Sequence, residues 1–191
     1  MMHYEKELPE HYHAAYTIDA ADKKTGIILN VIGAVIMIVL ILPAVFILRP
    51  WTGDIGKLSI GLLIVTVTLL VYLVLHELTH GAAYKLLTGQ KLTFGLTATV
   101  AYCGVPNIYI YRTASLIALL APFVVFDIVF GSAVIALQDP MNKFLAWLIF
   151  SIHVGGCVGD LYDTGLYLTR FRDKRTLMRD TGPKQTFYLP D

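Results

Sequence analysis

Long apolar runs, separated by short charged segments, dominate the pattern of this chain. The runs cover residues 25–48, 58–84, 113–138 and 144–169, and the first of them contains no charged residue. An α-helix rises 1.5 Å per residue, so a run of about 20 residues crosses the roughly 30 Å hydrocarbon core of a bilayer. The pattern therefore predicts four transmembrane helices with these bounds.

The segment that follows the second run has an alternating pattern instead. Apolar residues at positions 92, 94, 96, 98 and 100 are separated by threonines and a glycine, which is typical of a β-strand. The turn-forming sequence at 104–107 and the apolar and aromatic residues at 108–111 then predict a return strand. We therefore expect a β-hairpin over residues 91–111, and an amphipathic connecting loop is the alternative.

The predicted fold class is an all-α integral membrane protein with four transmembrane helices and a small β-hairpin between helices 2 and 3. Residues 1–24 form an N-terminal segment, residues 25–169 the four-helix membrane domain, and residues 170–191 a basic tail. Hydrophobic residues make up 56% of the chain and charged residues only 15%, which excludes a soluble domain of this size. The net charge of +1 argues against a nucleic-acid partner.

The distribution of Lys and Arg predicts the orientation in the membrane. Twelve of these residues lie in the two terminal segments and the hairpin region, whereas only Arg49, Lys57 and Lys143 lie in the other two loops. Loops that remain in the cytoplasm carry the excess of positive charge. The sequence therefore predicts a multi-pass cell membrane protein with both termini in the cytoplasm.

The sequence His76-Glu77-Leu78-Thr79-His80 at the end of the second run is the main candidate for chemistry. Two histidines four residues apart lie on one face of a helix, so both imidazoles can bind one metal ion, and Glu77 lies beside it. A glutamate and two histidines are also costly to bury in a membrane without a metal, a partner or water. The pattern predicts a Zn²⁺ site with Glu77 as a general base.

A catalytic zinc normally has three protein ligands, so one further ligand is needed. No Glu follows Glu77, and the candidates within the predicted helices are Asp127, His153, Asp160 and Asp163.

Depth in the membrane separates these candidates. At 1.5 Å per residue, His76 lies about 28 Å from Lys57, and Asp160 lies about 26 Å from Lys143 on a helix of the same direction. Asp163, at about 30 Å, fits nearly as well, whereas His153 and Asp127 come out about 15 and 18 Å from the outer side. We expect Asp127 and His153 to form a buried, hydrogen-bonded structural pair, and both Asp160 and Asp163 remain candidate ligands.

With these features the chain resembles the small four-span putative zincin peptidases, which are distant relatives of the site-2 intramembrane proteases. The resemblance rests on the His-Glu-x-x-His motif within a span, the hairpin that follows it and Gly159-Asp160 on a later span, and it extends from about Leu58 to near Asp180. It implies that His76, His80 and Asp160 bind zinc and that Glu77 is the catalytic base. The ligand Asp of site-2 proteases has a Leu-Asp-Gly context that is absent around Asp160, so Asp163 stays an alternative.

The predicted function is that of a zinc-dependent, membrane-embedded endopeptidase. It would hydrolyse peptide bonds of membrane or membrane-proximal substrates, so its expected partners are a membrane protein or peptide and the lipid bilayer. The alternative is a non-catalytic zinc-binding membrane scaffold or adaptor. The presence of Glu77, and the lack of an obvious fourth protein ligand in the sequence, favour the enzyme.

Overall fold

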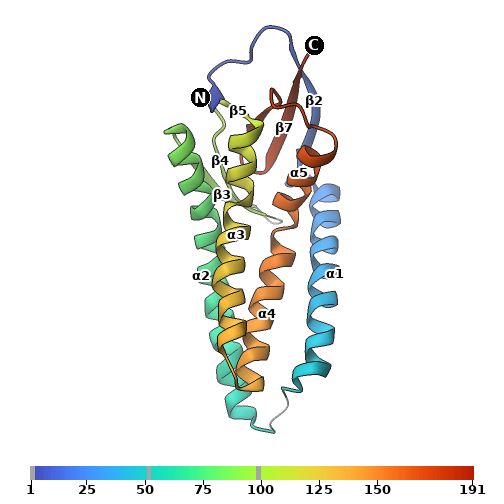
Figure 1. Ribbon diagram of the computed structural model, residues 1–191, viewed down its shortest axis with the longest axis vertical. Helices are drawn as coiled ribbons and strands as arrows, with labels where there is room; N and C mark the ends of the chain where they lie inside the picture. The colour runs from blue at the N-terminus through green and yellow to red at the C-terminus, as the bar shows by residue number, and fades with distance from the viewer. Residues whose placement is uncertain (1–2, 51–52, 98–99) are drawn as a thin grey trace. The chain divides into compact units, whose positions relative to one another are not determined.

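The computed structural model describes residues 3–50, 53–97 and 100–191 of the chain (Figure 1). The structure is mostly helical. The helices are α1 (Lys23–Leu48), α2 (Ile55–Thr88), α3 (Arg112–Ala136), α4 (Pro140–Gly156) and α5 (Val158–Thr169). The strands are β1 (Tyr4–Glu5), β2 (Tyr12–Asp19), β3 (Thr93–Leu96), β4 (Ala101–Gly104), β5 (Tyr109–Tyr111), β6 (Leu177–Asp180) and β7 (Lys184–Pro190).

Within the described residues, three helices are long and apolar enough to cross a membrane, namely α1, α2 and α3. The bent pair α4 and α5 adds a fourth if it counts as one span. Large apolar side chains along these helices are exposed, for example Phe46 on α1 and Ile135 on α3, at 74% and 77%. Lipid is the solvent that such a surface requires, so a multi-pass membrane protein fits the fold.

The predicted helix over residues 144–169 is interrupted in the structure. It divides at Cys157, which caps α4 with a backbone conformation outside the helical range. Gly155 and Gly156 precede the break, and glycine disfavours a continuous helix by about 1 kcal/mol per residue. The second half therefore forms a separate helix, α5.

The chain folds as two compact units. The first, which we call the helical unit, comprises Asn30–Leu75 and Phe123–Val158. In it α1 and α4 approach closely at two glycines, because a Cβ added to Gly33 would lie 2.5 Å from the carbonyl oxygen of Gly155. The indole N–H of Trp147 also donates to the carbonyl of Leu40 at 2.9 Å. Small residues at a helix contact are the usual way to bring two membrane helices together.

The second unit, which we call the sheet unit, comprises Met1–Leu29, His76–Pro122 and Gly159–Asp191. It holds a five-stranded antiparallel sheet in the order β1-β5-β6-β7-β2. The sheet buries Met178 and Phe187 against Leu119 of α3, Tyr167 of α5 and Phe171 in the loop that follows α5. Burial of such apolar side chains is the main force that holds a sheet to helices.

This sheet corrects the predicted fold class, which allowed for one hairpin only. The residues assigned to a polar N-terminal segment form β1 and β2, and the residues assigned to the basic tail form β6 and β7. β2 pairs with β7 along most of its length, from Tyr12 with Pro190 to Asp19 with Lys184. The two ends of the chain are therefore structural parts of the sheet unit.

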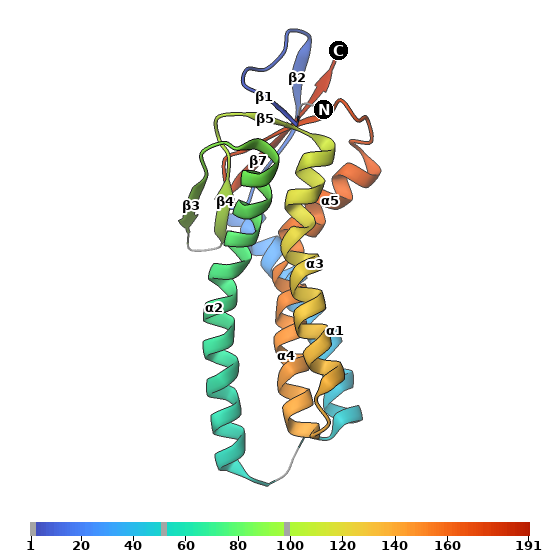
Figure 2. The same cartoon turned by 60° about the vertical axis from the view of Figure 1, so that its left-hand side comes forward.

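The hairpin after α2 is present, but its return strand differs from the prediction. β3 pairs with β4, with Thr93 opposite Gly104 and Leu96 opposite Ala101 (Figure 2). The predicted return strand, residues 108–111, contains β5, which pairs with β1 and β6 instead. The predicted strand positions 98 and 99 lie outside the described residues.

Candidate metal centre

The two histidines of the motif lie on one face of α2, in the part of this helix that belongs to the sheet unit. His76 and His80 are one helical turn apart, and both are buried, with 8% and 7% exposed. Their Nε2 atoms lie 3.2 Å from each other. The imidazoles therefore point to a common position, as the four-residue spacing predicts.

Asp160, in the first turn of α5, completes this cluster. Its Oδ2 lies 3.3 Å from His76 Nε2, and its Oδ1 lies 3.3 Å from His80 Nε2. We call His76, His80 and Asp160 the metal cluster, because their ligand atoms all lie within 4.8 Å of one another. In a tetrahedral zinc site with bonds of 2.0–2.1 Å, neighbouring ligand atoms lie about 3.3 Å apart. The three distances fit this geometry.

A carbonyl group orients the second histidine. His80 Nδ1 lies 2.8 Å from the backbone oxygen of Ala118 in α3, and this oxygen can only accept a hydrogen bond. Nδ1 therefore carries a proton, and Nε2, which faces His76 and Asp160, is the nitrogen that can bind a metal ion. In metal sites, a carbonyl that accepts from one ring nitrogen in this way fixes the orientation of the histidine whose other nitrogen binds the ion.

Glu77, the predicted base, is partly buried beside the metal cluster. Its carboxylate interacts with the backbone N–H of Cys103 in β4. Burial raises the pKa of the Cys103 thiol to about 12, so this thiol is neutral at physiological pH. Cys103 therefore contributes its backbone amide to the site, beside a thiol that is neutral.

Asp163, the alternative ligand, lies one turn after Asp160 on α5 and is 4% exposed. Its Oδ1 has no hydrogen-bond partner among the described residues. The aspartate whose oxygens lie within 4.8 Å of the ligand atoms of both motif histidines is Asp160, and Asp163 does not belong to this group. The geometry thus favours Asp160 of the two candidates.

Asp127 and His153 lie together in the helical unit, but not as the buried, hydrogen-bonded pair that the sequence predicts, because Asp127 is partly exposed. His153 Nε2 is 3.3 Å from Asp127 Oδ1, an ion-pair distance without the geometry of a hydrogen bond. The Tyr72 hydroxyl lies 2.7 Å from the other ring nitrogen, His153 Nδ1. The imidazole is fully buried and is surrounded by aromatic rings, whose centroids lie within 6.5 Å of its own: those of Tyr72, Phe123, Phe126, Phe130 and Phe150.

Sequence reasoning missed several groups that hold these side chains. The carbonyl of Ala118 and the amide of Cys103 are backbone groups, which no residue type reveals. Tyr72 and Tyr84 had a usable signal, because they stand four residues before His76 and four residues after His80 on the same helix. A polar side chain at each of these positions extends the pattern of the motif along one helical face.

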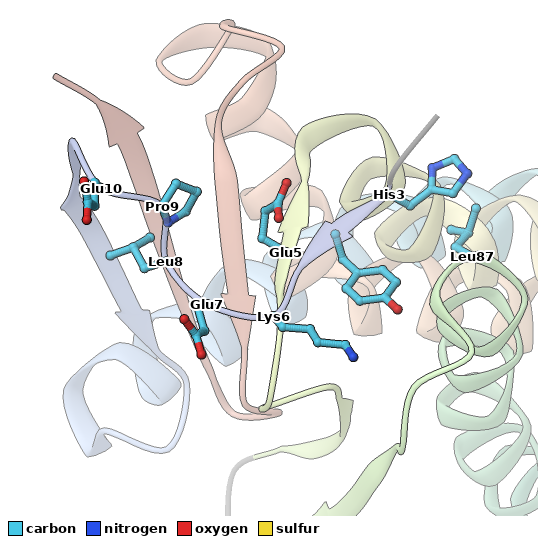
Figure 3. A pocket seen from close by; sticks show the side chains of 9 residues that line it. His3, Glu5, Lys6, Glu7, Leu8, Pro9, Glu10 and Leu87 are labelled. Carbon is cyan, nitrogen blue, oxygen red and sulfur yellow. The ribbon is translucent and has the colours of Figure 1, made fainter.

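A surface pocket of about 790 Å³ lies elsewhere in the sheet unit. It is lined by residues 3–10 and Leu87, and Figure 3 shows these side chains around the N-terminal strand β1 and the loop that follows it. None of the metal cluster residues lines it. The pocket therefore does not mark the candidate metal centre.

Comparisons with known proteins agree with the chemistry of the metal cluster. A family model described as putative zincin peptidase matches residues 69–174, which is more than half of the chain and includes the three residues of the cluster. Neither the comparison with curated proteins nor that with solved structures gave a match.

Proposed function

Because the chain belongs to the putative zincin peptidase family, we propose that it is a zinc-dependent endopeptidase embedded in a membrane. Its substrates would be membrane proteins or peptides that lie at the membrane. The observation that carries the proposal is the spacing of 3.2–3.3 Å among His76 Nε2, His80 Nε2 and the Asp160 carboxylate. This spacing suits a tetrahedral Zn²⁺ ion with a fourth position left for water or substrate.

Each residue of the site has a role in this reaction. Zinc, when bound by His76, His80 and Asp160, supplies a Lewis acid that makes water nucleophilic near neutral pH. The Glu77 carboxylate accepts a proton from the attacking water and passes it to the nitrogen of the leaving amine as the C–N bond breaks. The Cys103 amide, which interacts with this carboxylate, would help to orient it.

The substrate would bind in an extended form next to β4. Proteases need an accessible scissile carbonyl, so a helical segment must first unwind, and an extended peptide can then add to a strand edge. β4 pairs with β3 on one side only, and within the described residues no strand pairs with its other side. Because Cys103 of β4 interacts with Glu77, a peptide along this free side would pass the catalytic carboxylate.

The proposed location is a cell membrane with both termini in the cytoplasm. It is supported by the three or four membrane-spanning candidates and by the excess of Lys and Arg in the terminal and hairpin segments. The sheet unit, which contains both termini, would then lie at the cytoplasmic side.

The decisive experiment is Glu77→Gln. We expect this variant to keep one zinc per chain, because the three ligands are unchanged, and to lose activity by about 10³-fold, since general base catalysis contributes about 10²–10⁴. Purified protein in micelles would be analysed for metal, and the cleavage of single-span membrane peptides would be followed by mass spectrometry. Glu7→Gln is the matched control, because Glu7 is exposed and outside the metal cluster. Undiminished cleavage by Glu77→Gln would refute the mechanism.

A further inference from the structure

Tyr84 and Asp180 form a buried hydrogen bond within the sheet unit. Tyr84 lies on α2 one turn after His80, and Asp180 ends β6, with 1% and 2% of the two residues exposed. The Tyr84 hydroxyl donates to Asp180 Oδ2 at 2.5 Å. Hydrogen bonds to a carboxylate are short and about twice as strong as neutral ones. This contact therefore ties the α2 segment of the motif to the sheet.

Asp180 also holds the end of β4. Its backbone carbonyl accepts a hydrogen bond from the Val105 N–H at 3.0 Å, and its Oδ1 accepts one from the Gly182 N–H at 2.8 Å. A Cβ added to Gly104 of β4 would lie 2.4 Å from the Gly182 nitrogen. The β4 backbone thus rests directly on the turn that Asp180 stabilises.

One residue therefore contacts both elements that frame the proposed reaction. α2 carries the histidines and Glu77, and β4 carries the Cys103 amide that interacts with the Glu77 carboxylate. The separation of α2 and β4 sets where this carboxylate is held. A misplacement of about 1 Å in a catalytic constellation can lower the rate about 100-fold.

We propose that Asp180 is a positioning residue that fixes β4 against the α2 face carrying the His-Glu-x-x-His motif. It does so through Tyr84 with its side chain and through Val105 with its backbone. The catalytic consequence rests on the proposed peptidase function, whereas the attachment of β4 to α2 is independent of it. Two measurements can therefore test the two parts separately.

The first measurement is amide hydrogen exchange of the full-length protein in micelles, followed by mass spectrometry of peptides that contain residues 101–105. Tyr84→Phe removes only the hydroxyl, and we expect exchange in this segment to become at least tenfold faster. Tyr111→Phe is the matched control, because the Tyr111 hydroxyl donates to a carboxylate of the same sheet, Glu5 Oε1 at 2.8 Å, and not to Asp180. Asp180→Asn, which keeps the size of the side chain, should accelerate exchange like Tyr84→Phe. Equal exchange in Tyr84→Phe and the unaltered protein, or equal acceleration by Tyr111→Phe, would overturn the proposal.

The second measurement is the activity of the same variants on the peptide used for Glu77→Gln. We expect Tyr84→Phe to lower kcat about tenfold, to keep KM within twofold and to retain one zinc per chain. The double variant Tyr84→Phe with Asp180→Asn should be no slower than the slower single variant, because both changes break one contact. Additive losses, or loss of zinc from Tyr84→Phe, would exclude a positioning role. If Glu77→Gln itself stays active, the peptidase proposal fails, while the exchange result still decides whether Asp180 holds β4.

Discussion

Each of the two units of this protein contains a cluster of histidine and aspartate. The clusters differ in how their ring nitrogens and carboxylate oxygens are arranged. In the metal cluster of the sheet unit, two Nε2 atoms and one carboxylate converge within 3.3 Å of each other. In the helical unit, the single imidazole of His153 has Tyr72 on one nitrogen and Asp127 near the other, with aromatic rings around it. Convergence of donor atoms suits a cation, whereas partners on opposite sides of one ring suit packing.

The aromatic surroundings of His153 point to a role in stability. Edge-to-face and stacked ring pairs each contribute about 0.5–1.5 kcal/mol beyond the burial of their area. His153 is fully buried, and Tyr72 and Phe126 form an edge-to-face pair beside it with centroids 5.0 Å apart. The imidazole shares a hydrogen bond with Tyr72 at one nitrogen, has Asp127 at an ion-pair distance from the other, and fills the space among these rings.

The largest expected difference between the clusters is in metal content. Asp160→Asn removes the anionic ligand, so we expect the purified protein to lose most of its zinc and its activity to fall by about 10³-fold or more. Asp127→Asn changes the same residue type in the other cluster and should retain one zinc per chain. Elemental analysis of both proteins after gel filtration is the measurement.

Asp163→Asn completes this test, because it decides between the two aspartates that the sequence leaves as ligands. We expect it to retain zinc like Asp127→Asn. If Asp160→Asn retains zinc and Asp163→Asn loses it, Asp163 is the ligand and the assignment is wrong. If Asp127→Asn loses zinc, the proposed difference between the two clusters is wrong.

The next largest effect concerns stability. His153→Ala empties a fully buried position among aromatic rings, and large-to-small core substitutions of this kind cost about 3 kcal/mol. We expect the free energy of unfolding in micelles to fall by about this amount while the zinc content stays unchanged. Denaturant unfolding followed by circular dichroism, together with metal analysis, measures both quantities. A stable His153→Ala protein without zinc would show that His153 serves the metal instead of the core.

The sequence predicts these helices and both clusters because their signals are local or depend on length alone. Apolar runs define α1, α2 and α3, and counting 1.5 Å per residue from Lys57 and Lys143 brings His76 and Asp160 to one depth. The break at Cys157 changes the helix in which Asp160 lies, but leaves it near the histidines.

The five-stranded sheet was not predictable in the same way, because its pairings join distant parts of the chain. Tyr12 of β2 lies opposite Pro190 of β7, and the charged residues around both strands hide their alternation. The strand pattern at Tyr109–Tyr111 was visible, but alternation defines which side a residue faces and not which strand pairs with it. The Asp180 contacts depend on this sheet, so they too were missed.

The last expected difference between the two units is the sign of their pH dependence. Burial raises the pKa of Asp180 in the sheet unit from its usual 3.8 to about 6, although hydrogen bonds from Tyr84 and Gly182 oppose this rise. The folded state therefore holds this proton more tightly than the unfolded state. The resulting stabilisation is complete below about pH 4 and is lost as the pH rises through 6, an effect of about 3 kcal/mol. Asp139 in the helical unit has its pKa lowered by the Asn142 N–H and by Lys57, so its contribution to stability is present at neutral pH and is lost in acid.

The measurement is the difference in unfolding free energy between the unaltered protein and Asp180→Asn from pH 4 to 7. The effect of pH on zinc binding cancels in this difference, because both proteins keep the same ligands. This difference should shift against the unaltered protein as the pH rises from 4 to 7, whereas the difference from Asp139→Asn should stay nearly constant above about pH 4 and shift against the unaltered protein only in stronger acid. A flat difference for Asp180→Asn would mean that its carboxyl is not the buried, proton-retaining group that the sheet unit encloses.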